Sequence, residues 1–172
     1  MRFEQPGWAK LLPAETVVGV ATLGPLGARM RAPGTWGSAA GTLYFVLCFS
    51  YMGIAGNLIA SAVGFYFAVG VCGEAEARLG RRDPAEVILD EFVSMPLCFL
   101  GWQWIAGTQT WPYLGLLAAG FVLFRVYDIV KPWVIDSLQE LPGGWGIVAD
   151  DTAAALATCA TLHLAHALWA LR

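Results

Sequence analysis

Charged residues along this chain occur in groups, and three long stretches between the groups contain none. No Asp, Glu, Lys or Arg lies between Arg31 and Glu74, between Glu91 and Arg125, or between Asp151 and Arg172. A membrane-spanning helix needs roughly 17–25 predominantly apolar residues. The first two stretches are therefore long enough for two spanning helices each, and the third for one.

Turn residues divide the two longer stretches near 51–57 and near 106–112. The sequence predicts an all-α, polytopic membrane protein with about five spans, near 37–52, 55–73, 92–107, 112–130 and 152–171. The apolar segment 16–27 is shorter and is interrupted by Gly24 and Pro25, which favours an interfacial or re-entrant position. We expect one domain over 1–172, with 1–30 as an interfacial N-terminal arm.

The composition supports a membrane protein. Hydrophobic residues make up 58% of the chain and charged residues 13%, whereas a soluble domain carries about a quarter charged residues. The net charge of −3 does not indicate nucleic-acid binding. The cysteines lie in apolar segments without Cys-x-x-Cys spacing, which is typical of small buried side chains rather than of disulfides or zinc; they are Cys48, Cys72, Cys98 and Cys159. The N-terminus lacks the long apolar core of a signal peptide.

With a cytoplasmic N-terminus, the charges fall on one side of the membrane. Nine of the ten Lys and Arg residues then lie inside, which agrees with the positive-inside rule; they are Arg2, Lys10, Arg29, Arg31, Arg78, Arg81, Arg82, Arg125 and Lys131. All thirteen Asp and Glu residues also lie inside. Aromatic residues gather at the predicted outer face, namely Tyr51, Trp102, Trp104, Trp111, Tyr113 and Trp169. Every candidate catalytic group is thus placed in the cytoplasmic layer.

The first inner segment with candidate chemistry is 29–38. Pro33 and Gly34 predict a turn, and Thr35 or Ser38 can cap the following helix. Backbone N–H groups at a helix start, with two hydroxyls and nearby arginines, suit a phosphate group. An ordinary capped turn is the alternative interpretation.

The second segment is 83–92. Asp83 and Pro84 predict a helix start, which places Glu86 and Asp90 on one face with Glu91 beside them. The segment leads directly into an apolar stretch, and acidic residues entering a membrane are costly and usually functional.

The third region is 124–151. Arg125, Asp128 and Lys131 are spaced to share one helical face, where simple pairing within the helix is the alternative. The run 143–146, Gly-Gly-Trp-Gly, predicts a flexible loop. It leads to Asp150 and Asp151 at the mouth of the last span. Helix capping would explain one of these aspartates but not both.

Five carboxylates therefore lie at the inner ends of three predicted spans: Asp90, Glu91, Asp128, Asp150 and Asp151. Converging carboxylates without Cys or His are typical of hard cations, so Mg²⁺ is favoured over zinc. The two histidines, His163 and His166, lie deep in the last span or towards its outer end, where packing or hydrogen bonding between helices is expected.

Four motifs in order resemble the bacterial phosphatidylglycerophosphatase A family: 33–38, PGTWGS; 90–92, DEF; 124–128, FRVYD, with Lys131 and Pro132; and 143–151, GGWGIVADD. They cover residues from about 24 to 152. Ser94 stands where the family pattern leads us to expect Gly, and the N-terminal arm is somewhat long.

The resemblance implies a Mg²⁺-dependent lipid phosphatase of the bacterial inner membrane with its active site facing the cytoplasm. It would convert phosphatidylglycerophosphate to phosphatidylglycerol and phosphate. Asp90, Glu91, Asp150 and Asp151 would hold one or two Mg²⁺, with Asp128 as a further ligand or general base. We expect Asp128, Asp151 and Lys131 to be catalytic, and Gly34, Thr35, Ser38, Arg125 and Lys131 to bind phosphate. A water activated by the metal is the simplest nucleophile, and an aspartyl-phosphate intermediate is an alternative.

Three other functions fit parts of the pattern. A cation or proton transporter also places acids near helix ends, although more often near the bilayer midplane. A non-catalytic membrane assembly factor needs no convergence of acids. A phosphatase for another lipid or isoprenoid phosphate keeps the site and changes the substrate. The sequence leaves the oligomeric state open.

Overall fold

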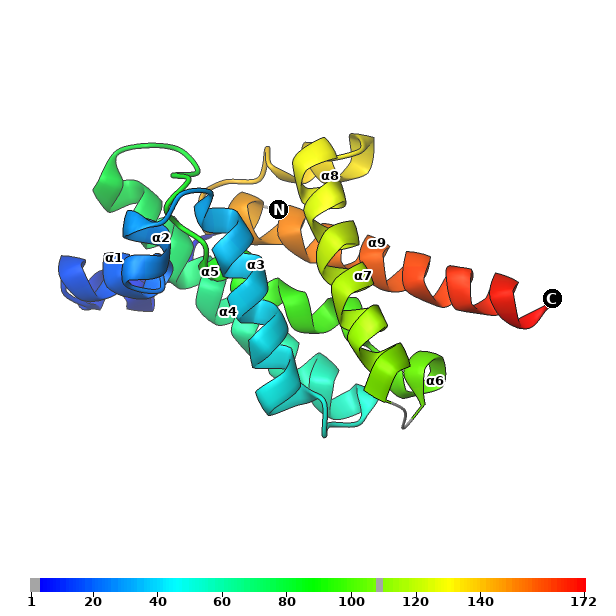
Figure 1. The fold of residues 1–172 in the computed structure, drawn as a ribbon. Helices are drawn as coiled ribbons and strands as arrows, with labels where there is room; N and C mark the ends of the chain where they lie inside the picture. The colour runs from blue at the N-terminus through cyan, green and yellow to red at the C-terminus, as the bar shows by residue number, and fades with distance from the viewer. Residues whose placement is uncertain (1–3, 108–109) are drawn as a thin grey trace.

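The computed structural model describes residues 4–107 and 110–172, without the side chains at 110, 111 and 133, and in this part every regular element is a helix (Figure 1). This confirms the predicted all-α class. The elements are η1 Gly7–Leu11, α1 Ala14–Ala21, α2 Pro25–Arg29, α3 Pro33–Tyr44, the π-helical turn η2 Phe45–Phe49, α4 Ile54–Leu79, α5 Leu89–Ser94, the 3₁₀ helix η3 Met95–Phe99, α6 Trp102–Ala106, α7 Thr110–Val130, α8 Trp133–Leu138 and α9 Gly144–Ala170.

Three of the described helices are long and apolar enough to cross a membrane: Ile54–Leu79, Pro112–Val130 and Gly144–Ala170. They coincide with three of the five predicted spans, although α4 continues to Leu79 and α9 begins at Gly144 rather than near 152. The predicted span 37–52 corresponds to α3 and η2, which follow one another without a break from Pro33 to Phe49.

The predicted span 92–107 is not a single helix. It consists of α5, η3 and α6, separated by Leu100 and Gly101. Pro96 lies in η3, where proline cannot donate the backbone hydrogen bond that an α-helix requires. Gly101 has a φ of 66° and changes the chain direction before α6.

Side chains of neighbouring helices satisfy the backbone groups that this break leaves free. His163 Nε2 lies 2.7 Å from the carbonyl oxygen of Leu100, and because a carbonyl only accepts, Nε2 is the donor. Asn57 Nδ2 donates to the carbonyl oxygen of Pro96 at 3.5 Å. Irregular backbone at membrane depth is tolerated where protein covers it, and residues Met95–Phe99 are buried. The predicted role of His163 in contacts between helices is confirmed.

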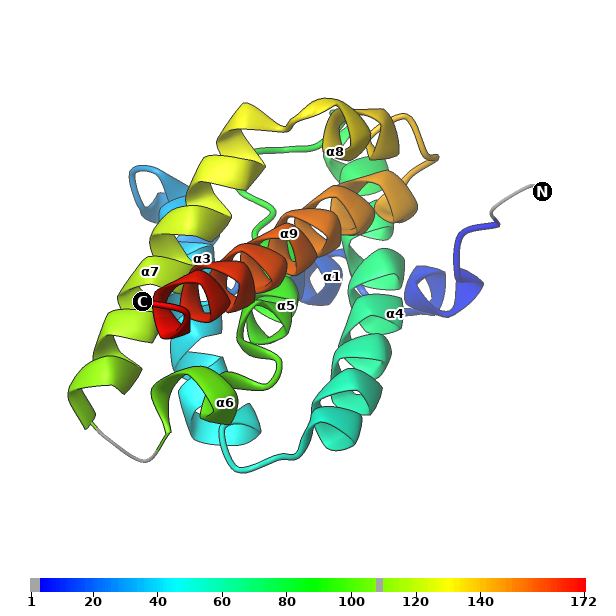
Figure 2. The same cartoon turned by 90° about the vertical axis from the view of Figure 1, so that its right-hand side faces the viewer.

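The broken segment lies in the middle of the fold, with α3, α4, α7 and α9 around it (Figure 2). The turn between η2 and α4 lies at one end of the bundle with α6, while α8 and the start of α9 lie at the other. Helix α9 runs obliquely to α4 and α7, and its C-terminus projects sideways from the other helices (Figure 1).

Glycines on α3 allow the backbone of this helix to lie close to α5. A Cβ on Gly37 would collide with Glu91 Oε2 and with Ile88, and one on Gly41 would lie 2.8 Å from the carbonyl oxygen of Phe92. Small residues permit such close approach between membrane helices. This contact brings the start of α5, with its acidic pair, against the first turns of α3.

Two predicted helix starts are wrong, and so is one predicted helical face. Helix α3 begins at Pro33 and has Ala32 as its N-cap, without a side-chain cap, because proline suits the first helical position; neither Thr35 nor Ser38 caps it. Asp83 does not start a helix either, since 81–88 form a loop and α5 begins only at Leu89. Glu86 therefore shares no helical face with Asp90 and instead pairs with Arg81.

The predicted burial of the cysteines is partly confirmed, whereas the aromatic belt at the outer face stays a prediction. Tyr51 and Trp104 are highly exposed, and Trp102 donates to the carbonyl oxygen of Ser50 at 3.3 Å. The side chain of Trp111 and the basic residue Arg2 lie outside the described part. Cys72 and Cys98 are buried as expected, but Cys48 is exposed because its side chain lies on the outer surface of η2.

Gly144 generates a test of the packing between α9 and α4. A Cβ at this position would collide with the backbone carbonyl of Val69 and lie 2.9 Å from the backbone nitrogen of Gly73. Two backbones cannot yield as a flexible side chain can, so Gly144→Ala should lose about 1–3 kcal/mol of stability. The thermal midpoint in detergent, followed by fluorescence-detected size exclusion, measures this loss.

Gly115→Ala is the matched control, because nothing lies within 4 Å of a Cβ added there. Alanine is a better helix former than glycine by about 1 kcal/mol, so this variant should be at least as stable as the parent. Equal midpoints for the two variants would show that α9 does not pack closely on α4.

Candidate active site

Asp90 and Glu91 lie in the first turn of α5 and are both buried, at 5% and 9% exposure. Asp90 Oδ1 and Glu91 Oε2 have no hydrogen-bond partner. Buried polar atoms are normally paired, because an unpaired one retains the full cost of leaving water. Two unpaired carboxylate oxygens on adjacent residues therefore indicate a place for a positively charged or proton-donating ligand.

Arg125 links α7 to both α5 and α3. One of its guanidinium nitrogens, Nη1, lies 2.8 Å from Glu91 Oε1 and 2.7 Å from Asp128 Oδ2. The same nitrogen lies 3.4 Å from Ser38 Oγ. The predicted pairing within the helix is thus present for Arg125 and Asp128, but the same cation also holds a carboxylate from another helix.

Lys131 lies directly after the last residue of α7 and has a φ of 43°. Its side chain reaches α9, where Nζ lies 2.7 Å from Asp150 Oδ2. Gln139 donates to the same oxygen at 2.9 Å. Asp150 is therefore the anchor that fixes the position of the lysine ammonium.

Asp150 and Asp151 lie inside α9, six and seven residues after its first residue. They cannot cap this helix, and the predicted glycine loop is also wrong, because 144–146 are helical and only Gly143 precedes the helix, with a φ of 55°. The two carboxylates are 3% and 4% exposed. The backbone N–H of Asp151 donates to Asp150 Oδ1 at 3.0 Å.

These residues line one cavity of about 300 Å³. All of the predicted site residues except Thr35 and Ser38 contribute to its wall: Gly34, Asp90, Glu91, Arg125, Asp128, Lys131, Asp150 and Asp151. Ser38 is buried just behind it and contacts Arg125. Thr35 is exposed, and its backbone N–H donates to the carbonyl oxygen of Ala32, so the structure does not bring it into the cavity.

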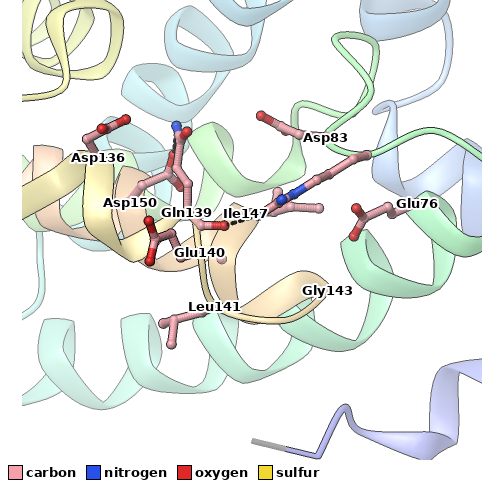
Figure 3. Close-up of a pocket in the computed structure, with 11 residues that line it drawn as sticks. Glu76, Asp83, Asp136, Gln139, Glu140, Leu141, Gly143, Ile147 and Asp150 are labelled. Carbon is pink, nitrogen blue, oxygen red and sulfur yellow. Dashed lines mark hydrogen bonds between the residues drawn. The ribbon is translucent and has the colours of Figure 1, made fainter.

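A second cavity of about 460 Å³ lies next to the first and shares Asp83, Ile147 and Asp150 with it. Figure 3 shows this cavity, with Gln139 and Asp150 on one side and Asp83 and Glu76 on the other. Of the predicted site residues, only Asp150 reaches it. The smaller cavity is therefore the candidate active site.

Burial and mutual repulsion dominate the electrostatics of α5. Asp90 and Glu91 are adjacent in the chain and both buried. Arg125 forms an ion pair with Glu91, while Lys131 pairs with Asp150. Burial alone would lower the pKa of Lys131, but the hydrogen bond and charge of Asp150 outweigh it and raise this pKa overall. The cavity thus favours added positive charge.

The donor set fits Mg²⁺ in kind, since the orphaned oxygens belong to carboxylates, the ligands that this ion prefers. In the part of the chain that the structure describes, no three His, Cys, Asp or Glu side chains form a ready group for a metal ion. Mg²⁺ commonly takes only one or two carboxylates and completes its shell with water and substrate phosphate. The residues present are compatible with such a site.

Sequence patterns missed Asp83 and Gln139. Asp83 lines both cavities, but its position before a proline suggested a helix cap. Gln139 lies between α8 and α9, and no motif marks it; its contact with Asp150 depends on how 131–143 fold back over α9. Arg82 donates to the backbone carbonyl of Gln139 and so connects this segment to the loop 81–88.

Comparison with known proteins agrees with this geometry. The family model described as Phosphatidylglycerophosphatase A matches residues 19–166. The chain is 37% identical to phosphatidylglycerophosphatase A of Haemophilus influenzae over 73% of each chain. It is 28% identical to the protein of the same name from Escherichia coli, over 81% of this chain and 77% of the relative.

A third relative, from Bacteroides thetaiotaomicron, is provisionally named a phosphatidylinositol-3-phosphatase and is 33% identical over 72% of this chain and 76% of its own. No solved structure matches the chain. The family model covers most of the sequence, including every residue that lines the candidate site. The chain therefore belongs to the phosphatidylglycerophosphatase A family and is a phosphoric monoester hydrolase.

Proposed function

We propose that this enzyme hydrolyses phosphatidylglycerophosphate to phosphatidylglycerol and phosphate with Mg²⁺ as its cofactor. It would do so in the bacterial inner membrane, with the cavity open to the cytoplasm. The chain would cross the membrane about five times, with the run from α3 to η2 and the broken segment from α5 to α6 as the two shorter crossings. Family membership and the printed names of the two phosphatidylglycerophosphatase relatives support the substrate.

The charge balance of the cavity carries the proposal for the cofactor. Six carboxylates line it, against the two cations Arg125 and Lys131; the acids are Asp83, Asp90, Glu91, Asp128, Asp150 and Asp151. A phosphate monoester is itself an anion, and these acids would repel it. A divalent cation held by Asp90 and Glu91, together with Asp150, Asp151 or Asp128, would offset that repulsion and polarise the phosphoryl oxygens when bound.

The chain's own residues would then position the substrate. Arg125 and Lys131 face the cavity and would neutralise charge that develops on the phosphoryl oxygens. Gly34 leaves room at the start of α3, where an added Cβ would collide with Glu91 and lie 3.0 Å from Arg125 Nη1. Ser38 would support this phosphate site through its contact with Arg125, whereas Thr35 lies outside the cavity and has no part in this proposal.

The hydrolytic step needs a base and an acid. Water attacks the phosphorus atom, the bond from phosphorus to the glycerol oxygen breaks, and that oxygen leaves with a proton. Asp128 or Asp151 would accept the proton of the attacking water, while Lys131 is placed to protonate the leaving oxygen. Glu91 and Asp150 would hold the side chains of Arg125 and Lys131 in position through their ion pairs.

The name of the Bacteroides thetaiotaomicron relative favours a second candidate, a phosphatase that acts on a phosphorylated inositol lipid. The same cavity would accept its phosphomonoester if the charged residues bind the phosphate and leave the rest of the head group free. Release of phosphate from that lipid at a higher kcat/KM than from phosphatidylglycerophosphate would keep the site and change the substrate.

The first prediction about activity concerns the metal. Purified protein should release phosphate from phosphatidylglycerophosphate when Mg²⁺ is present, and EDTA should abolish release, because the uncompensated acids then repel the substrate. Added Mg²⁺ should restore activity. Full turnover in EDTA would refute the proposed cofactor but leave the family assignment standing.

The second prediction concerns the acids. Asp90→Asn and Asp151→Asn should each lower kcat by about 100-fold or more, because each removes a proposed ligand of the metal that would stabilise transition-state charge. Asp136→Asn is the matched control, because Asp136 lines only the larger cavity. It should keep the turnover of the parent. Activity that falls with Asp136→Asn and not with the other two would move the active site to the larger cavity.

The third prediction concerns Arg125. Arg125→Ala should lose about 100–1000-fold in kcat, and Arg125→Lys should recover only part of it, because a single ammonium lacks the guanidinium's fixed set of donors. Arg78→Ala is the control, because Arg78 is buried to a similar extent and also forms an ion pair, with a distance of 2.8 Å between its Nε and Glu74 Oε1. This pair does not line the cavity. Equal losses in Arg125→Ala and Arg78→Ala would mean that Arg125 acts only in folding.

A further inference from the structure

An apolar groove lies between α3 and α7 on the outside of the bundle. It has a volume of about 290 Å³, and its walls are Ala39, Thr42, Leu117, Ala118 and Phe121. Thr42 supplies its one hydroxyl, which donates to the carbonyl oxygen of Ser38 at 2.9 Å. The groove therefore presents a hydrocarbon surface rather than a polar site.

The same two helices form the wall of the candidate active site. Gly34 on α3 and Arg125 on α7 line the charged cavity, and Arg125 reaches Ser38 across the contact between the helices. Figure 1 shows α3 and α7 side by side, with their charged ends at the same end of the bundle. The cavity and the groove therefore lie one after the other along the contact between α3 and α7.

The distance between the cavity and the groove can be estimated from residue numbers on either helix. On α3, Ala39 and Thr42 follow Gly34 by five and eight residues, or roughly 7–12 Å at the helical rise. On α7, Phe121 and Leu117 precede Arg125 by four and eight residues, or roughly 6–12 Å. The two counts agree, so the groove begins about 6–7 Å from the charged cavity and continues away from it.

That separation matches the structure of a bilayer. The hydrocarbon core is about 30 Å thick within a total of about 40–45 Å, so each polar layer is roughly 5–8 Å deep. A lipid whose terminal phosphate lies in the cavity would have its acyl chains begin at about the depth of the groove.

We propose that this groove binds one acyl chain of the phospholipid substrate. The inference rests on the proposed function and adds the part of the site that recognises the lipid tail. A chain bound along α3 and α7 would hold the head group against Arg125 and Lys131. A protein partner is a poorer occupant, because a stable interface buries about 1,200–2,000 Å², far more than five small or half-buried residues offer.

Ala118 gives the test, because it is exposed on the wall of the groove. Ala118→Trp should fill the groove, and Ala119→Trp should not, since Ala119 is equally exposed but is not part of the wall. Each variant and the parent would be assayed in mixed micelles with two forms of phosphatidylglycerophosphate, one with sixteen-carbon chains and one with four-carbon chains. The readout is the ratio of kcat/KM for the long-chain lipid to that for the short-chain lipid.

We expect the parent to prefer the long-chain lipid. Ala118→Trp should lower this preference roughly tenfold, the low end of what a hydrophobic pocket contributes to discrimination, while activity on the short-chain lipid is retained. Ala119→Trp should leave the ratio unchanged. Expression and elution volume of the two variants should be the same.

Several results would overturn the inference. These are a parent without chain-length preference, equal ratios in the two variants, or an equal loss on both lipids in Ala118→Trp. A change of elution volume confined to Ala118→Trp would assign the groove to contact between copies of the chain. Absence of phosphate release by the parent from either lipid would reject the proposed function, and the acyl-chain site with it, whereas the other results leave hydrolysis intact.

Discussion

The burial of Asp90 and Glu91 at the start of α5 is the constraint to which the rest of the fold is fitted. A buried carboxylate is costly unless a cation or several donors compensate it. Here Gly34 and Gly37 of α3 pack against Glu91, and Arg125 compensates one oxygen of its carboxylate. Asp90 Oδ1 and Glu91 Oε2 are left without a partner, and a bound ligand could offset the desolvation cost of these two oxygens. Such sites are where function is usually found.

The break after α5 places a short buried segment next to the acidic pair. Pro96 and Gly101 interrupt the helix here. His163 and Asn57 donate to the carbonyl oxygens of Leu100 and Pro96. The central segment therefore acts as a buried support for the acidic pair, and the long helices around it supply the apolar surface towards the lipid.

Much of the site could be predicted from the sequence, because hydrophobicity and charge act locally along the chain. The uncharged stretches correctly indicated the positions of α4, α7 and α9. The predicted acidic and basic residues of α5, α7 and α9 do meet in one cavity, together with Lys131. Contacts set by tertiary packing could not be read in this way. Asp83 reaches the cavity from an irregular loop, and Gln139 reaches Asp150 only because Lys131 turns the chain back over α9. Helix α3 begins at Pro33, earlier than predicted from Thr35 and Ser38 as capping residues.

The surplus of acids in the cavity can be balanced by protons or by a cation, and the substrate distinguishes the two. Protonation of both Asp90 and Glu91 would still leave Asp83, Asp128, Asp150 and Asp151 against Arg125 and Lys131. That balance is negative, and a phosphate monoester adds further negative charge. In a buried site, where electrostatic interactions are poorly screened, proton uptake alone would therefore leave the substrate repelled. With all six carboxylates ionised against Arg125 and Lys131, a divalent cation would remove half of the excess negative charge of the lining. This reduction supports the proposal of metal-dependent hydrolysis over catalysis by acid groups alone.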